Sequence, residues 1–184
     1  NIIWIKSCRM NELLASAILL IGVTSPPDLP NNNSFKYTHS DSIKCLALNM
    51  YHEARDQGTA GKLAVSAVVL NRVNDSRFPN TVCEVIRQGP TKKSWKNSAI
   101  SYPIRNRCQF SWYCDGLSDK PKDKIEYKKI LNLSNMIMHN DIPFIDITDG
   151  ALFYHADYVT PSWSKIKQKT TEIGDHIFYK WEKK

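Results

Sequence analysis

The chain has 184 residues, of which 42% are hydrophobic and 23% are charged. This length allows one domain with a substantial core, and this composition excludes a disordered or fibrous protein. The formal net charge is +7 at pH 7. Such a charge favours polyanionic partners, which include nucleic acid, anionic lipid and an anionic cell wall, but does not choose among them. A lysine-rich surface that is merely solvated is the alternative.

The N-terminal part of the chain resembles an export signal. Lys6 and Arg9 precede an apolar run from Leu13 to Val23, which is typical of a secretory signal. The run is shorter than the roughly 20 residues that span a bilayer, and Pro26 disfavours cleavage just before it. An additional core helix is the alternative for this run. We expect a signal or signal-anchor segment in residues 1–25, a linker in residues 26–36 and a folded catalytic-size domain in residues 37–184.

A first helix is expected from Ser40 to Arg55. Leu46, Met50 and Glu53 fall at i, i+4 and i+7, so the Glu53 carboxylate faces the core side of this helix. Burial penalises the charged form of a carboxylate, which raises its pKa and keeps a proton available for a leaving group. Glu53 is therefore a candidate general acid. The alternative is a helix-face residue paired with Arg55 or a lysine.

Two more helices are expected before the chain reaches its central loops. The segment from Ala60 to Val73 is apolar on most sides and should form the buried central helix. Thr81 to Glu84 fits a capping box that opens a short helix, and Gly89 is expected to end it. Residues 88–103 are expected to form a loop.

The segment from Cys108 to Gly116 is dense in aromatic and hydrogen-bonding side chains. Aromatic rings stack on sugar faces and amides bond to sugar hydroxyls, so this segment could line a sugar cleft. A purely structural aromatic cluster is the alternative. The cysteines show no Cys-x-x-Cys or zinc-like grouping, so we expect no structural metal. Cys108 and Cys114, with Cys83 or Cys45, could form one or two disulfides in an exported domain, or remain buried thiols in a reducing compartment.

The last third of the chain changes from helix to strand. A helix is expected from Lys122 to Asn140, and a strand from Ala151 to His155. Thr170 to Lys180 is expected to form a hairpin, because Gly174-Asp175 suits a type II′ turn. Helices followed by a small antiparallel sheet predict the α+β class.

Seven blocks of this domain together resemble one family. They are Tyr51–Arg55, Val65–Val73, Phe78–Val82, Cys108–Ser111, Phe153–Ala156, Pro161–Trp163 and Ile173–Tyr179. In this order and spacing they resemble the SleB/CwlJ-type cell-wall hydrolase family over about residues 44–180. The resemblance implies a lysozyme-like, mainly helical domain with a small antiparallel sheet near the C-terminus. It also implies action on peptidoglycan glycan strands, Glu53 as the catalytic acid, and no cofactor.

The reaction depends on whether a second carboxylate is present. Glycoside hydrolases commonly use two carboxylates, and no second acid in the matched blocks has a claim like that of Glu53, although Asp56, Asp115 and Asp157 lie near them. Better-known members of the family are lytic transglycosylases, in which the C6 hydroxyl of N-acetylmuramic acid (MurNAc) attacks. We therefore expect Glu53 to work alone and to give 1,6-anhydro-MurNAc ends. The alternatives are a hydrolytic muramidase of the same fold and a non-catalytic peptidoglycan-binding module.

Five other residues are expected to bind substrate. Gln109 and Ser111 would hold N-acetyl or hydroxyl groups, and Tyr154 would stabilise positive charge that develops on the sugar. His155 or Trp163 would line a subsite, with a structural histidine and a core tryptophan as the alternatives.

The expected partner is peptidoglycan, bound by a monomer, and no nucleic acid is expected because no recognised motif accompanies the charge. The expected location is the periplasm or cell wall, with transient inner-membrane association through the N-terminal segment. The long segment from Gly89 to Arg107 and its neighbouring cysteines resemble phage and Gram-negative relatives, so a phage endolysin is expected.

Overall fold

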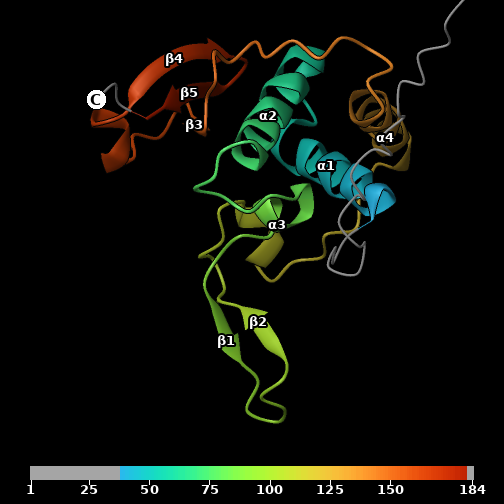
Figure 1. Cartoon of the computed structure of the whole chain (residues 1–184), viewed down its shortest axis with the longest axis vertical. Coiled ribbons are helices and arrows are strands. Elements are labelled where there is room, and N and C mark those ends of the chain that lie inside the picture. Colours follow the sequence, from blue (N-terminus) through green and yellow to red (C-terminus); the bar gives the residue numbers. More distant parts are fainter. Residues whose placement is uncertain (1–37, 182–184) are drawn as a thin grey trace, which may run out of the picture. The chain divides into compact units, whose positions relative to one another are not determined.

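A computed structural model describes residues 38–181, and the expectations for residues 1–36 lie outside the described residues. Its helices are α1 (His39–Ala54), α2 (Gly58–Val73), α3 (Val82–Ile86) and α4 (Lys124–Met138), with 3-10 turns η1 (Ser111–Cys114) and η2 (Ser162–Lys165). Its strands are β1 (Thr91–Lys93), β2 (Ser101–Pro103), β3 (Phe153–Ala156), β4 (Gln168–Ile173) and β5 (His176–Lys180) (Figure 1). No helix within residues 38–181 is both long and apolar enough to cross a membrane.

The two long N-terminal helices form where the sequence predicted them, with ends that differ by one or two residues. Thr38 caps α1, since its hydroxyl accepts the Asp41 N–H while the Asp41 carboxylate accepts the Thr38 N–H. Leu46 and Met50 are fully buried, and Val65 and Val69 of α2 belong to the same core cluster. The predicted core face of α1 is thus confirmed.

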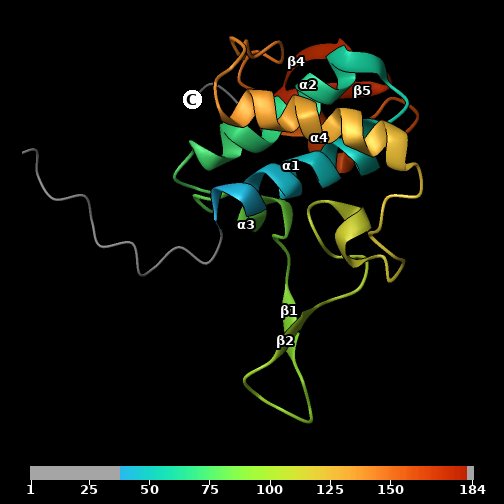
Figure 2. The same cartoon turned by 90° about the vertical axis from the view of Figure 1, so that its right-hand side faces the viewer.

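Helix α1 is the central element of the helical layer. It packs against α2, α3 and α4, and α4 lies alongside it in Figure 2. A disulfide between Cys45 and Cys83 joins α1 to α3, with a Cα–Cα distance of 5.4 Å. A second disulfide joins Cys108 to Cys114. Two disulfides were among the alternatives left open by the sequence.

The predicted loop over residues 88–103 is wrong, because it contains the β1–β2 hairpin. Strand β1 pairs antiparallel with β2, so that Lys92 lies opposite Tyr102. The prediction that Gly89 ends α3 is also wrong, since that helix already ends at Ile86. Gly89 instead lies against Cys108, and a Cβ there would be 3.0 Å from the Cys108 Cα. The glycine therefore allows a close backbone approach at the base of the hairpin.

A three-stranded antiparallel sheet follows, in the order β3-β5-β4. Strand β5 is central, and its Phe178 is fully buried against Ala64 and Val68 of α2. The β4–β5 turn has a positive φ at Gly174 and not at Asp175, which agrees with the predicted type II′ turn. The prediction of an α+β domain with a small antiparallel sheet near the C-terminus is confirmed.

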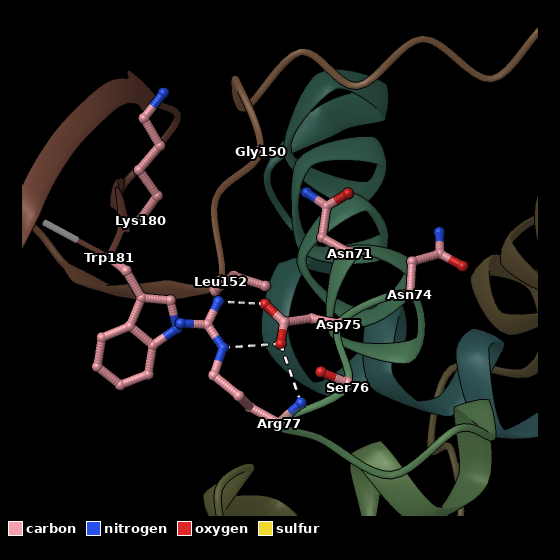
Figure 3. Close-up of a pocket in the computed structure, with 9 residues that line it drawn as sticks. All are labelled: Asn71, Asn74, Asp75, Ser76, Arg77, Gly150, Leu152, Lys180 and Trp181. Atoms are coloured by element: carbon pink, nitrogen blue, oxygen red, sulfur yellow. Dashed lines mark hydrogen bonds and ion pairs between the residues drawn. The ribbon is translucent and has the colours of Figure 1, made fainter. Parts of the chain in front are cut away.

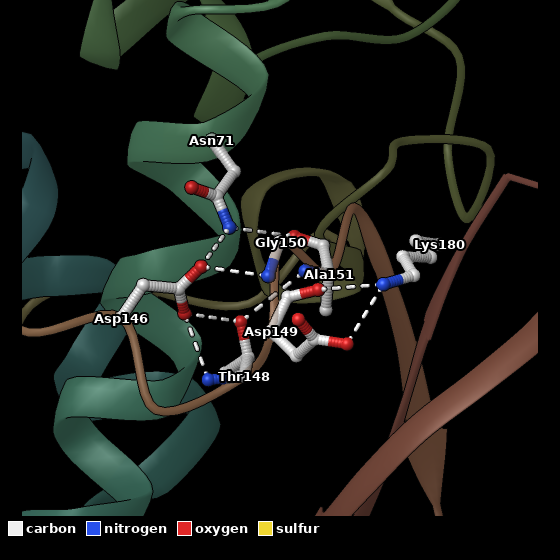
Figure 4. Close-up of polar contacts among 7 residues, drawn as sticks. All are labelled: Asn71, Asp146, Thr148, Asp149, Gly150, Ala151 and Lys180. Carbon is white, nitrogen blue, oxygen red and sulfur yellow. Dashed lines mark hydrogen bonds and ion pairs between the residues drawn. The ribbon is translucent and has the colours of Figure 1, made fainter.

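The chain enters β3 through a junction that is held by α2. The Asp146 carboxylate accepts hydrogen bonds from the backbone N–H groups of Thr148 and Gly150 and from the Asn71 amide (Figure 4). Asn71 also donates to the Ala151 carbonyl at 3.1 Å. The start of β3, and with it the position of Tyr154, is therefore set from the end of α2.

Candidate active site

Glu53 lies in the last turn of α1, and its carboxylate meets β3 of the sheet. The Tyr154 hydroxyl donates a hydrogen bond to Glu53 Oε2 at 3.0 Å, across 101 positions of sequence. The side chain of Glu53 is partly buried, with its carboxylate lining a cleft. A carboxylate at the end of α1 is thus hydrogen-bonded to strand β3.

Burial raises the pKa of the Glu53 carboxyl above its ordinary value of 4.5. The Tyr154 hydrogen bond and the charge of Arg72 oppose this rise, because both favour the ionised carboxylate. The pKa of Tyr154 is raised well above 10.0, by burial first and by the neighbouring Glu53 second, so the hydroxyl keeps its proton. Glu53 is therefore an acid that holds its proton to higher pH than a solvated glutamate, beside a permanent donor.

Replacing Tyr154 with phenylalanine should move the alkaline limb of the pH–activity profile to higher pH. The substitution removes a hydrogen bond that lowers the pKa of Glu53, so the acid stays protonated over a wider range. Turbidity loss of purified peptidoglycan, measured across pH, would check this. Tyr158→Phe, at an exposed tyrosine of the same cleft, should leave the limb in place. A shift to lower pH in Tyr154→Phe would contradict the assignment.

Arg72 supplies a buried positive charge to this site. Its side chain from α2 is 5% exposed, and its Nε donates to the Leu152 carbonyl at 2.7 Å. The guanidinium carbon lies between 5.2 and 5.7 Å from the ring centroids of Phe78, Phe110 and Phe153. Burial lowers the pKa of Arg72 to about 10, so it stays charged at neutral pH. This charge favours the carboxylate that Glu53 becomes after giving up its proton.

The cleft over Glu53 has a volume of about 480 Å³. It brings together four of the substrate-binding residues predicted from the sequence: Gln109, Ser111, Tyr154 and His155. Phe110 and Trp112 add aromatic surface beside the exposed Gln109 and Ser111. The arrangement of rings next to amide and hydroxyl groups suits a sugar ligand.

The His155 and Trp163 side chains make contacts within the fold. His155 is buried, with Nδ1 2.8 Å from the Ala156 carbonyl, so Nδ1 carries the proton and Nε2 accepts from the Tyr179 hydroxyl at 3.0 Å. Trp163 does not line the Glu53 cleft, because its ring packs against Phe153, His155 and Tyr179. The structure thus favours the alternative of a structural role for both.

Several cleft residues received no role from the sequence. His52 stacks on Trp112 with ring centroids 4.6 Å apart, and its Nε2 donates to the Asp119 carbonyl. Gln57 Oε1 accepts from His176 Nδ1 at 3.0 Å. Asp175 lines the same cleft as Glu53. All of these residues except Gln57 lie in or beside the seven sequence blocks that resemble the family. Their position in these blocks was the available indication, in the sequence, that they could belong to the site.

The second acid in the lining of the cleft is Asp175, which received no role from the sequence. Asp56 pairs with Arg55 and lines the adjoining hollow that also contains Glu53 and Asp175. Asp115 lines a different hollow, and Asp157 lines neither of these hollows nor the cleft. Asp175 was overlooked because Gly174-Asp175 was interpreted only as a turn. Gln57, the N-cap residue of α2, contacts the main chain of this turn, because its Oε1 accepts a hydrogen bond from the Asp175 N–H at 3.3 Å.

Two further hollows adjoin the cleft. One, of about 400 Å³, shares His52 and Trp112 with it, and another, of about 260 Å³, shares Glu53 and Asp175. A larger shallow hollow of about 710 Å³ lies elsewhere, beside Trp181 (Figure 3). Its charged groups are already paired, Arg77 with Asp75 and Lys180 with Asp149. The hollows around Glu53 therefore form the candidate active site.

Comparison with known proteins identifies the family of this chain. A family model described as Cell Wall Hydrolase matches residues 56–179. The chain belongs to the cell wall hydrolase family. The match begins three residues after Glu53 and does not include that residue. The SleB/CwlJ-type resemblance inferred from the sequence blocks is thereby confirmed.

Relatives of this cell wall hydrolase include spore cortex-lytic enzymes. That of Bacillus cereus is 28% identical over 156 residues, which are 84% of this chain and 50% of the relative. That of Oceanobacillus iheyensis is 30% identical over 145 residues, which are 78% of this chain and 43% of the relative. The chain thus spans about half the length of the curated relatives that it matches.

Two solved structures share the fold of this cell wall hydrolase. The catalytic domain of Bacillus cereus SleB is 29% identical, with a TM-score of 0.51, and the match covers 85% of this chain and 98% of that domain. The catalytic domain of the germination-specific lytic transglycosylase SleB from Bacillus anthracis is 28% identical, with a TM-score of 0.50, and the match covers 83% of this chain and all of that domain. The predicted lysozyme-like, mainly helical fold is confirmed.

Proposed function

We propose that this chain cleaves the glycan strands of peptidoglycan as a lytic transglycosylase. The observation that carries the proposal is the Glu53 carboxyl, whose pKa is raised by burial and which accepts a hydrogen bond from Tyr154, in the lining of a polar and aromatic cleft. The similarity to the SleB catalytic domains supports the same class of substrate and reaction.

Glu53 would act twice in this reaction. First it donates its proton to the oxygen that links MurNAc C1 to the next N-acetylglucosamine, and the C1–O bond breaks with the electron pair going to that oxygen. The C6 hydroxyl of the same MurNAc then attacks C1, and its proton passes to the Glu53 carboxylate. The products are a free 4-hydroxyl and a 1,6-anhydro-MurNAc end. Arg72 and Tyr154 would stabilise the carboxylate between the two steps.

The adjoining hollows support a polymer as the substrate. One of them shares the stacked His52 and Trp112 with the cleft, and the other shares Glu53 with it, so several sugar units could lie along the three hollows. Gln109 and Ser111 would hold N-acetyl or hydroxyl groups at the cleft, and Trp112 would offer a ring edge or face.

Hydrolysis is the second candidate, and Asp175 is the observation that favours it. An inverting hydrolase activates water with a carboxylate across the cleft from the acid, and Asp175 lines the cleft of Glu53. The Asp175 side chain is exposed, so a water molecule can reach it.

Mass spectrometry of the products, combined with Asp175→Asn, separates the two candidates. A transglycosylase should release anhydro ends and keep its product type in Asp175→Asn, because the attacking oxygen belongs to the substrate. Asp141→Asn, at an exposed acid of the described chain, is the matched control. Hydrated reducing ends from the wild type, together with loss of activity on the order of 100-fold in Asp175→Asn, would reject the transglycosylase in favour of the hydrolase.

The proposed setting is the periplasm or cell wall of a bacterial host. The polymer lies there, and residues 1–25 would provide export with transient inner-membrane association. We propose a phage endolysin that acts as a monomer. Fractionation of expressing cells, followed by detection of the chain in the periplasmic or membrane fraction, would test this location.

A further inference from the structure

The β1–β2 hairpin presents large apolar side chains that the fold does not use. Trp95 in its connecting turn is 89% exposed, Tyr102 is 50% exposed and Ile100 is 44% exposed. The two strands pair with each other and form a sheet of their own. An isolated two-stranded hairpin is marginally stable in water, and clustered exposed apolar groups mark interaction surfaces. The hairpin is thus a candidate binding element.

The base of the hairpin is attached to the domain by hydrogen bonds, whereas Trp95 near its end is exposed. The Ile104 N–H donates to the Pro90 carbonyl, and the Gln109 N–H donates to the Gln88 carbonyl, both at 2.9 Å. The Cys108–Cys114 disulfide closes the segment that follows. Figures 1 and 2 show the ribbon extending away from the helices in both views. The fold therefore holds this ribbon out rather than leaving it as an unattached loop.

The charged side chains of the hairpin and its base are all positive. No Asp or Glu occurs between Glu84 and Asp115, a stretch that contains Arg87, Lys92, Lys93, Lys96, Arg105 and Arg107. Lys92 lies directly opposite Tyr102 in the strand register. The Lys96 ammonium lies 5.0 Å from the centre of the Trp95 ring. The ion pairs of residues 38–181 include none of the three hairpin lysines, so their charges are available to an anionic partner.

Aromatic rings surrounded by lysines are the composition that binds the interface of an anionic bilayer. Trp and Tyr settle at headgroup level, and each nearby lysine adds attraction to anionic lipid. A glycan would instead need a hollow with amide or hydroxyl groups beside the ring, and no residue of the hairpin lines the cleft or the other three hollows. The observations therefore favour lipid over wall polymer.

We propose that the β1–β2 hairpin docks this chain on an anionic lipid bilayer. Trp95 and Ile100 enter the headgroup region, while Lys92, Lys93 and Lys96 contact the lipid phosphates. Gln109 both lines the cleft and bonds to the hairpin base, so docking keeps the cleft within roughly 25 Å of the bilayer, the length of a seven-residue strand. The proposal does not depend on which bond the cleft breaks.

The test is flotation of the full chain with vesicles of phosphatidylcholine that contain phosphatidylglycerol. Lys92→Gln, Lys93→Gln and Lys96→Gln combined should weaken partitioning on the order of 100-fold. The matched control combines Lys124→Gln, Lys128→Gln and Lys165→Gln, which removes the same charge from exposed positions elsewhere. Because residues 1–37 are present in every variant, only the difference between the two triples is scored. The control should retain most of its binding.

A second readout locates the contact at Trp95. In a Trp4→Phe background, which removes the tryptophan of the proposed membrane-associated segment, brominated phosphatidylcholine in the same vesicles should quench tryptophan fluorescence. Adding Trp95→Phe should abolish most of that quenching while the chain still binds. Equal flotation of the two triple variants would overturn the proposal. Unchanged quenching in Trp95→Phe would also overturn it. So would a hairpin triple variant that loses binding to purified cell-wall sacculi but still binds vesicles, since this result would assign the hairpin to the wall polymer.

Discussion

Glu53→Gln is expected to reduce cleavage of purified peptidoglycan by about 10³-fold or more. The amide keeps the shape of the side chain and can still meet the Tyr154 hydroxyl, but it has no proton to donate to a leaving oxygen. Release of soluble fragments, measured by turbidity and mass spectrometry, would quantify the loss. Glu172→Gln, at an exposed glutamate that pairs with Lys169, is the matched control and should keep full activity.

The same variant should not lose stability at pH 7. A carboxyl whose folded-state pKa is raised stabilises the fold fully below its unfolded pKa, near 4.5, and this contribution is lost as pH rises through the folded pKa. At neutral pH, which lies above the unfolded pKa, the raised pKa of Glu53 therefore costs stability, and glutamine removes that cost. The melting temperature should equal or exceed that of the wild type. Retained binding with lost turnover would also reject a non-catalytic binding module, whereas substantial residual cleavage would refute the role of Glu53.

Removing the Cys45–Cys83 disulfide is expected to cost about 3 to 4 kcal/mol of unfolding free energy. The bond closes a loop of 38 residues between α1 and α3, and the open unfolded chain regains that loop entropy. Both cysteines are buried, so Cys45→Ala with Cys83→Ala also loses packing. The melting temperature should fall by about 10 °C or more, as followed by circular dichroism.

The second disulfide is the internal comparison for this experiment. Cys108 and Cys114 are separated by only 6 positions, so the entropic gain on breaking their bond is smaller, about 2 kcal/mol. Cys108→Ala with Cys114→Ala should therefore melt above the first double variant. If the Cys108→Ala, Cys114→Ala variant melts at the same temperature as the first double variant or lower, the long loop is not the source of the stability.

The elements that could be predicted from sequence have local signals. The apolar spacing of α1 and α2 predicts the wide face that each helix buries, and Gly174 marks a turn that needs a positive φ. Glu53 could be found because it continues the buried face of Leu46 and Met50. In each case neighbouring positions in the sequence carry the information.

The remaining features depend on contacts between distant segments. Strands β1 and β2 are three residues each and almost entirely exposed, so they lack the alternation that identifies a half-buried strand. Arg72 occupies an apolar helix, and only the fold reveals that three aromatic rings surround it. Asp175 joins the cleft only because the β4–β5 turn reaches it.

The pair Asn71-Arg72 at the end of α2 has a consequence for how this site can vary. Asn71 holds Asp146 and the Ala151 carbonyl, and Arg72 holds the Leu152 carbonyl, so Tyr154 is positioned by the helix. The connection over residues 139–145, between α4 and this junction, does not determine the position of Tyr154. The length of this connection can therefore change at little cost in chain entropy without moving Tyr154. A shift of α2 by one residue, in contrast, would separate Tyr154 from Glu53.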